Sequence, residues 1–201
     1  SETNKQAPKL MLGFNRRFSP HVKKITELLT PLHAPKNMVM TVNAGFIPKD
    51  HWTQDAEVGG GRLLGEACHF VDLLRFLAGS KITDASCANL SAEYSHMAED
   101  ENITITLRFA DGSQGSVHYF ANGHKAFPKE RLEVFCGGKI IQLDNFRKMK
   151  AYGFKGFSKM NSMRQDKGQR DCVKAFVDAI EKGTPSPIPL TEIIEVSEVC
   201  L

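Results

Sequence analysis

The chain has 201 residues, with 26 Lys and Arg against 23 Asp and Glu, so its formal net charge is +3. That charge is too small to indicate a nucleic-acid or acidic-membrane partner by bulk electrostatics. The hydrophobic fraction of 41% and the charged fraction of 24% match an ordinary folded domain, and they exclude disordered, collagen-like and disulfide-dense chains.

The predicted elements begin with a strand, a helix and a second strand. The apolar run Lys9–Asn15 is typical of a strand, and a serine followed by a proline predicts the start of a helix over residues 19–30. Alternating residues in Asn37–Ala44 predict the second strand. A long loop over Gly45–Gly61 follows and holds Trp52, the only tryptophan; loops of this length are often functional.

The middle of the chain is rich in strand patterns between helices. Leu63–Leu77 is the clearest helix, and Gly79 is placed to end it. Two further helices are expected over residues 169–182 and 190–201, after a loop over residues 153–163. Six strands are expected between the helix over residues 63–77 and the helix over residues 169–182. They are Ile82–Ala92, Asn102–Phe109, Gln114–Phe120, Arg131–Phe135, Lys139–Leu143 and Phe146–Tyr152.

Clustered strands joined by short turns indicate an α+β domain rather than a doubly wound one. We expect a mostly antiparallel sheet of about six strands, with helices packed on one face. The other face would then be available for association with a second copy, since a flat apolar remainder favours a partner.

Cysteine usage and the chain start bear on location. The polar start SETNKQAPK leads into no signal-peptide core, and no run approaches the roughly 20 apolar residues of a membrane span. The cysteines are odd in number and have no C-x-x-C spacing, which is typical of reduced thiols. We therefore expect a cytoplasmic protein without a membrane partner.

The helix over residues 63–77 carries a polar row opposite its apolar face. Projection at about 100° per residue puts Glu66, His69, Asp72 and Arg75 on that row. A solvated face with local charge pairs is one interpretation. The alternative is a functional row, because it begins at a helix N-terminus directly after three glycines.

A histidine one turn from a carboxylate is suited to general acid–base chemistry. The imidazole titrates near neutral pH, and Glu66 can fix the tautomer of His69 and raise its basicity. The spacing also matches a di-iron ligand pair, but the sequence offers no second Glu-x-x-His, so we expect no metal site and no metal-dependent isomerase or hydrolase. The glycines do not form a dinucleotide fingerprint either, because no βαβ unit surrounds them.

Four segments stand out in order along the chain. They are GFNRRFSP, GGGRLLGEACHFVDLLRFLAGS, KERLEVFCGGKIIQLDNFRKM and DKGQRDCVKAFVDAIEKGTPSPIP. Together they resemble the C-terminal domain of the Gfo/Idh/MocA family of NAD(P)-dependent oxidoreductases, from about Leu10 to Leu201. Within that family the chain is most similar to the subgroup linked to sugar nucleotides and cell-surface polysaccharides.

The resemblance implies a two-domain enzyme of which this chain is one part. Residues 1–18 resemble the last strand and crossover of a Rossmann domain, and residues 19–201 resemble the substrate-binding and oligomerisation domain. The family's glycine-rich loop and catalytic lysine segment are missing, which predicts that NAD or NADP binds mainly outside this chain. The expected activity is hydride transfer between that cofactor and a sugar or sugar-nucleotide carbon, with a homo-oligomer formed through the sheet face.

The resemblance also implies roles for individual residues. His69 matches the family histidine that exchanges a proton with the substrate hydroxyl, and we expect Glu66 to assist it. The family usually has an aspartate at the position of Gly65. Arg16 is the only residue for which we expect a cofactor contact. The residues expected to bind substrate are Asn15, Arg17, Asp72, Lys125 and Gln169.

Two functions stay open at this point. Retention of His69 and Glu66 favours the substrate half of a sugar oxidoreductase. The glycine at Gly65 favours a non-catalytic binding or assembly module with the same fold. The basic run Asn15-Arg16-Arg17 fits either an anion contact or simple surface solvation.

Overall fold

The computed structural model describes residues 8–48, 50–55, 58–59, 61–90 and 102–201. The helices are α1 (Pro20–Leu29), α2 (Cys68–Ala78), α3 (Gln169–Glu181) and α4 (Leu190–Cys200). Short helical turns are η1 (Asn15–Phe18), η2 (Thr30–Leu32), η3 (Trp52–Gln54) and η4 (Leu63–Ala67). The strands are β1 (Lys36–Asn43), β2 (Ile82–Asn89), β3 (Asn102–Phe109), β4 (Gln114–Phe120), β5 (Glu130–Cys136), β6 (Lys139–Asp144), β7 (Lys148–Tyr152) and β8 (Lys159–Asn161).

The strands form one sheet in the order β2-β3-β4-β1-β5-β6-β7-β8. The expected α+β class is confirmed, but the sheet has eight strands, and β1 pairs parallel to β4 while the other pairs are antiparallel. Antiparallel neighbours can be predicted from the short hairpin turns that join them. The parallel β1–β4 pair joins strands 77 residues apart, and no local sequence signal predicts it. The three-residue β8 is too short for its period-two pattern to stand out within the loop expected there.

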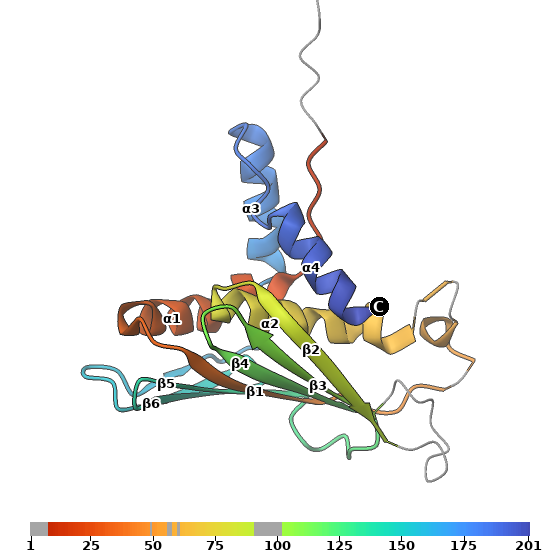
Figure 1. The fold of residues 1–201 in the computed structure, drawn as a ribbon, viewed down its shortest axis with the longest axis horizontal. Coiled ribbons are helices and arrows are strands. Elements are labelled where there is room, and N and C mark those ends of the chain that lie inside the picture. The colour runs from red at the N-terminus through yellow and green to blue at the C-terminus, as the bar shows by residue number, and fades with distance from the viewer. Residues whose placement is uncertain (1–7, 49, 56–57, 60, 91–101) are drawn as a thin grey trace, which may run out of the picture.

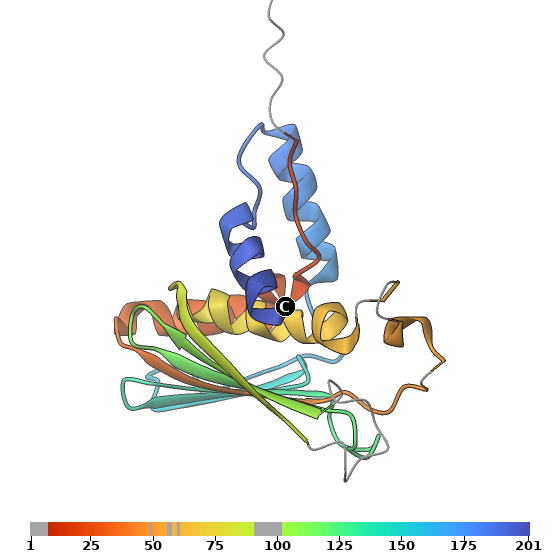
Figure 2. The same cartoon turned by 45° about the vertical axis from the view of Figure 1, so that its right-hand side comes forward.

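Helices α1 and α2 lie along one face of the sheet, while α3 and α4 rise from the far side of this helix layer (Figures 1 and 2). The core lies between the sheet and α2, which buries Phe70 and Leu74 completely. Helix and sheet approach closely at Gly115, where an added Cβ would lie 2.9 Å from Leu74 Cδ1. The absence of a side chain at Gly115 therefore lets α2 pack closely against β4.

The predicted strand over residues 9–15 is wrong. Residues 8–14 have no strand partner among the described residues, and the chain then turns through η1. A strand needs a neighbour for its backbone hydrogen bonds, and this segment instead runs beside α3 (Figure 2). It is held there by the Lys9 amino group on Ala179 O and by the Ser186 hydroxyl on Leu10 O.

The start of α1 differs from the expected cap in one respect. Ser19 and Pro20 occupy the expected positions, but the Ser19 hydroxyl donates to Asp166 O at 2.8 Å rather than capping its own helix. Gly168 makes this contact possible, since its φ is +83° and a Cβ there would lie 2.4 Å from the Ser19 nitrogen. The segment before α3 is thereby fastened to the start of α1.

One interpretation expected the polar row of the α2 region to be a solvated face, and the structure contradicts it. Asp72 is fully buried, because η1 and α4 cover this side of the helix. Arg17 bonds both carboxylate oxygens of Asp72 at 2.5–3.0 Å and also reaches Glu192 of α4 at 2.7 Å. Arg75 pairs in the same way with Glu195 at 2.9 Å. The row therefore joins three elements through charge pairs.

Other expectations hold with small shifts. Gly79 ends α2 with a φ of +68°, as expected of a helix-terminating glycine. The strand expected over residues 82–92 is described to residue 90, and its last two positions lie outside the described residues. Within the described part of the chain we find no helix with the length and apolar character that crossing a bilayer requires.

The buried pair between Arg17 and Asp72 predicts a large effect on stability. Asp72→Asn leaves the Arg17 guanidinium buried with less compensating charge, and breaking a buried pair in this way costs about 3–5 kcal/mol. We expect a clear drop in the free energy of unfolding, measured by urea denaturation. The control is Asp84→Asn, whose side chain is 67% exposed and lies 4.0 Å from Arg108, and which should change stability by under about 0.5 kcal/mol. Equal losses in the two variants would contradict the assignment.

Candidate functional site

A cavity of about 360 Å³ lies where the 45–62 segment meets the start of the α2 region. It takes side chains from η1, from η3 and from η4, so three separate parts of the chain build it. Three of its positions are glycines, which leave backbone close to whatever fills the cavity. The lining residues are Arg16, Ile47, Trp52, Thr53, Gly59, Gly61, Arg62, Gly65, Glu66 and His69.

His69 lies in the first turn of α2 and reaches the cavity wall. Its ring meets the Phe14 ring edge-on at 5.6 Å, and its Nδ1 atom is buried without a hydrogen-bond partner among the described residues. The pKa of His69 is lowered to about 4. Burial is the largest cause, and the nearby Arg16 charge lowers the pKa by more than Glu66 raises it. Glu66 does raise the pKa of His69, as expected, but burial and Arg16 outweigh it. The expectation that the imidazole titrates near neutral pH is therefore wrong, and it is neutral there.

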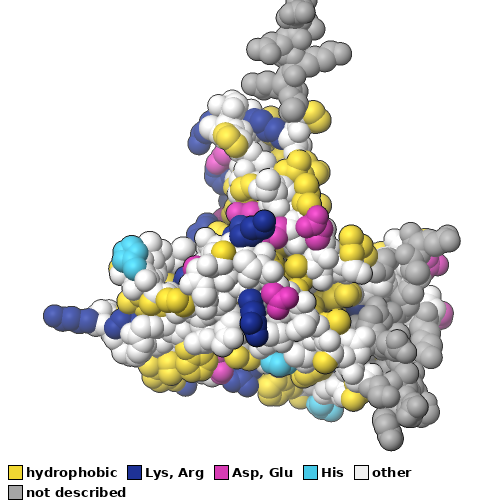
Figure 3. Space-filling model, in the orientation of Figure 1, with side chains coloured by type: hydrophobic (Ala, Val, Ile, Leu, Met, Phe, Trp, Pro, Cys, Tyr) yellow, Lys and Arg dark blue, Asp and Glu magenta, His cyan; other side chains and the backbone are white. Residues whose placement is uncertain are grey.

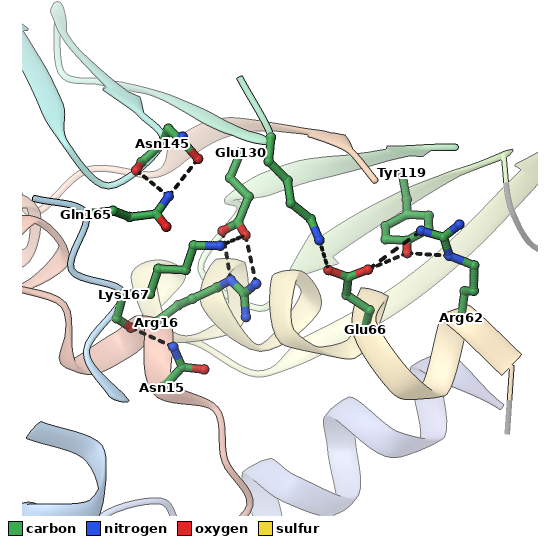
Figure 4. Close-up of polar contacts among 10 residues, drawn as sticks. Asn15, Arg16, Arg62, Glu66, Tyr119, Glu130, Asn145, Gln165 and Lys167 are labelled. Atoms are coloured by element: carbon green, nitrogen blue, oxygen red, sulfur yellow. Dashed lines mark hydrogen bonds and ion pairs between the residues drawn. The ribbon is translucent and has the colours of Figure 1, made fainter. Parts of the chain in front are cut away.

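Glu66 lies on η4, a π-helical turn that precedes α2. Its carboxylate accepts hydrogen bonds of 2.6 Å from the Tyr119 hydroxyl and from the Lys129 amino group, and it lies 3.8 Å from Arg62 (Figure 4). Burial alone would favour the neutral acid, but the bonds from Lys129 and Tyr119 outweigh it and lower the pKa of Glu66. Glu66 is thus a fixed negative charge whose described hydrogen bonds go to other groups than His69.

Arg16 is fixed at the opposite side of His69. Its guanidinium bonds both oxygens of Glu130 at 2.9 Å and stacks over the Phe70 ring at 4.4 Å. Lys167 adds a bond of 2.6 Å to the same carboxylate, as Figure 4 shows. Burial opposes ionisation of Glu130, but the bonds from Arg16 lower its pKa below the ordinary value. This cluster holds the Arg16 charge at the cavity with little freedom to move.

Several of these residues could not be found from the sequence. Tyr119, Glu130 and Lys167 lie on β4, β5 and the segment before α3, and no spacing along the chain relates them to His69. Arg62 is four residues before Glu66, a spacing typical of a helical ion pair, and this was the one local signal available. The sheet brings Tyr119 to Glu66 across 53 residues and Glu130 to Arg16 across 114. The segment before α3 adds Lys167.

The remaining expected site residues lie away from the cavity lining. Arg17 and Asp72 pair with each other in the interior, and the Asn15 amide donates to Lys167 O at 2.7 Å. Lys125 is exposed in the connection between β4 and β5, and Gln169 is exposed at the first position of α3. Among the described residues no group of three His, Cys, Asp or Glu side chains could hold a metal ion.

The cavity combines a neutral imidazole, two arginines and a fixed carboxylate around a small volume. Such a set can donate to and accept from the hydroxyl groups of a polar ligand, and its charges are already paired, so ligand binding does not have to neutralise them. A neutral histidine beside a hydroxyl can accept or share its proton. The cavity is near the lower end of the range for small-molecule sites.

Comparison with known proteins gives the chain its relatives. The chain is 25% identical over 143 residues to the uncharacterized oxidoreductase YrbE of Bacillus subtilis, covering 69% of this chain and 41% of that protein. It is 26% identical over 149 residues to the myo-inositol 2-dehydrogenase of Thermotoga maritima, covering 73% and 44%. The chain thus spans less than half the length of these curated relatives.

Solved structures with the same fold include two oxidoreductases. The UDP-N-acetylglucosamine 3-dehydrogenase GnnA of Acidithiobacillus ferrooxidans superposes with a TM-score of 0.75 at 16% identity, over 96% of this chain and 59% of that one. An oxidoreductase domain protein from Kribbella flavida gives a TM-score of 0.76 at 18% identity, over 96% and 63%.

The family model for the GFO/IDH/MocA C-terminal domain matches residues 35–141, which is more than half of the chain. The match runs from β1 to β6 and includes the cavity-lining residues between Ile47 and His69. The resemblance stated from four sequence segments is therefore confirmed, and the chain belongs to the GFO/IDH/MocA C-terminal domain family.

Proposed function

We propose that this chain is the substrate-binding part of an NAD(P)-dependent oxidoreductase acting on a sugar, a sugar nucleotide or a cyclitol. The observation that carries the proposal is the cavity at His69, where a neutral imidazole, Arg16, Arg62 and Glu66 converge. Relatives named for inositol and UDP-sugar oxidation support the substrate class. The substrate hydroxyl would bind within reach of His69.

The described residues do not fit the whole cofactor. A dinucleotide site needs a parallel βαβ unit with a phosphate loop, whereas this sheet is almost entirely antiparallel, and a cavity of about 360 Å³ is small for a dinucleotide. The proposal therefore places NAD or NADP on a Rossmann domain, of which residues 1–18 would form the end. It gives this chain the substrate side of the reaction.

Three residues have distinct tasks in this proposal. His69 would hydrogen-bond the reacting hydroxyl and take or return its proton. The fixed charges of Arg16 and Glu66 would orient the hydroxyl groups around the ring, while burial, together with Arg16, keeps the imidazole neutral. A histidine with a pKa of about 4 is a weak base before substrate binds, so the proposal needs the bound complex to supply the remaining driving force.

A second candidate function is non-catalytic binding. Its supporting observation is Gly65, which lines the cavity where the family usually has an acid, although a side chain would fit: an added Cβ would meet only Gly59 O, at 3.6 Å. A binding module would keep the cavity but would not need His69 to exchange a proton. Turnover measurements separate the two candidates.

The first prediction from the proposed function concerns turnover of the whole oxidoreductase. His69→Asn keeps a polar side chain but removes the proton acceptor, and we expect kcat to fall by about 10²–10⁴-fold, the usual contribution of one general acid or base. The measurement is cofactor reduction with myo-inositol or UDP-N-acetylglucosamine. The control is His33→Asn, an exposed histidine with a φ of 46°, which asparagine tolerates. Unchanged turnover in His69→Asn would favour the binding module.

The second prediction concerns pH and stability. The folded pKa of His69, about 4, lies below its unfolded value near 6.5, so the unfolded chain binds the extra proton more readily between these values. Stability should therefore be lost as the pH falls from about 6.5 toward 4, by about 1–3 kcal/mol for this residue. Urea denaturation of the chain and of His69→Asn across this range isolates the effect. Parallel curves for the two proteins would refute it.

The third prediction concerns association through the sheet. No described helix covers the face opposite α1 and α2, and Figure 3 shows hydrophobic side chains along that lower side. Val39, Phe120 and Phe135 alternate with buried neighbours on their strands and face this way. We propose that this face joins two copies, so sedimentation should show dimers or larger species, and Phe135→Glu should shift them toward monomer. The matched control, Phe46→Glu, lies outside the sheet and should leave association unchanged.

A further inference from the structure

One aromatic ring lies at the cavity without a packing role in the core. Trp52 lines the cavity together with Arg62, Glu66 and His69, yet 63% of its surface is exposed. Large aromatic side chains contribute most when they are buried, so an exposed indole beside a polar cavity leaves apolar surface free for a ligand. The proposed reaction assigns no task to this ring.

The turn that carries Trp52 is held by its own hydrogen bonds. His51 Nδ1 lies 2.9 Å from Thr53 Oγ1, and the Asp55 backbone nitrogen donates to Trp52 O at 3.2 Å. The His51 ring also lies 5.9 Å from the Trp52 ring, tilted by 34°. The backbone of η3 is therefore fixed at the cavity, while the indole extends from it.

A glycine lets the next part of the chain pack against this turn. Gly59 donates from its nitrogen to Asp55 O at 2.8 Å. A Cβ on Gly59 would lie 2.5 Å from Trp52 O and 2.6 Å from Thr53 Cα, both backbone atoms that cannot move aside without shifting the turn. The position of Trp52 at the cavity thus depends on a residue without a side chain.

We propose that Trp52 is the stacking platform for the ring of the substrate, and so a specificity-determining residue. This inference rests on the proposed function and adds a recognition element to it. A sugar or cyclitol ring has hydroxyl groups around its edge and C–H groups on its faces. The polar groups Arg16, Glu66 and His69 suit the edge, and the indole suits a C–H face.

The cavity favours one such ring over a flat nucleobase. Its volume of about 360 Å³ suits a single ring, and its wall carries hydrogen-bonding side chains from Arg16, Thr53, Arg62, Glu66 and His69. Each hydroxyl of a polyhydroxylated ring can both donate and accept, and such a ring presents hydroxyls around its whole edge, whereas each edge group of a base is a donor or an acceptor only. Stacking selects a ligand by the shape of its face, and the polar wall selects by the direction of its hydroxyl groups.

The chain offers a direct measurement, because Trp52 is its only tryptophan. Indole fluorescence of the 201-residue chain is titrated separately with N-acetylglucosamine, myo-inositol, UDP and UDP-N-acetylglucosamine. We expect a saturable change of emission with at least one ring compound and with no contribution from UDP alone. A change with UDP equal to that with the sugar nucleotide would overturn the inference, because the base would then be the stacked group.

Variants measured by calorimetry test the contact itself. With the ring compound that binds, Trp52→Ala should raise Kd roughly tenfold, which is about 1.4 kcal/mol, and Trp52→Phe should recover part of the affinity because it keeps an aromatic face. Gly59→Ala should also weaken binding by displacing the turn. The control is Tyr152→Ala, another half-exposed ring, on β7, which should leave Kd unchanged.

The outcomes separate this inference from the proposed function. Ring binding that Trp52→Ala does not weaken would overturn the role of Trp52 and leave the proposed substrate class standing. Absence of binding by every ring compound would count against both. Circular dichroism of each variant identifies a loss of affinity that comes from unfolding.

Discussion

Two consecutive arginines, whose side chains pair with different elements, hold η1 against the sheet and against two helices. Arg16 pairs with Glu130 of β5, and Arg17 pairs with Asp72 of α2 and with Glu192 of α4. Both guanidinium groups are nearly buried, and each is bonded to carboxylates at hydrogen-bond distance. A buried charge without such partners is too costly to keep, so η1, α2, α4 and β5 must meet at this point.

The same arrangement determines the chemistry of the cavity. Arg16 is held beside His69 by Glu130 and Lys167, and its charge adds to burial in lowering the pKa of the imidazole. Glu66 is held elsewhere, by Tyr119 and Lys129, so its opposing effect on that pKa is smaller. In the proposed function, charges that are already paired and fixed around a neutral histidine would bind polar groups without large rearrangement, which is the usual requirement for positioning a reacting hydroxyl.

The π-helical turn η4 is the local irregularity at the site. It carries Gly65 and Glu66 and precedes the regular α2, in which the Cys68 thiol donates to Leu64 O at 2.9 Å. A π-turn widens the helix and changes the direction of its side chains relative to a regular α-helix, and such turns are frequent at functional sites. Here it places Glu66 toward Tyr119 on the sheet, where a regular helical projection placed it in one row with His69.

The sequence by itself determined the elements and the family. Local patterns located α1, α2, α3, α4 and seven of the eight strands, since apolar spacing, caps and turn residues act within a few positions. They also predicted a strand over residues 9–15 that the structure does not have. It also singled out His69 and Glu66, because their residue types and spacing are local properties. Only the tertiary structure decided which charges surround them. Glu130, Lys167 and Tyr119 come from distant segments. Burial, which no local pattern measures, outweighed the effect of Glu66 on the pKa of His69 and enclosed Asp72.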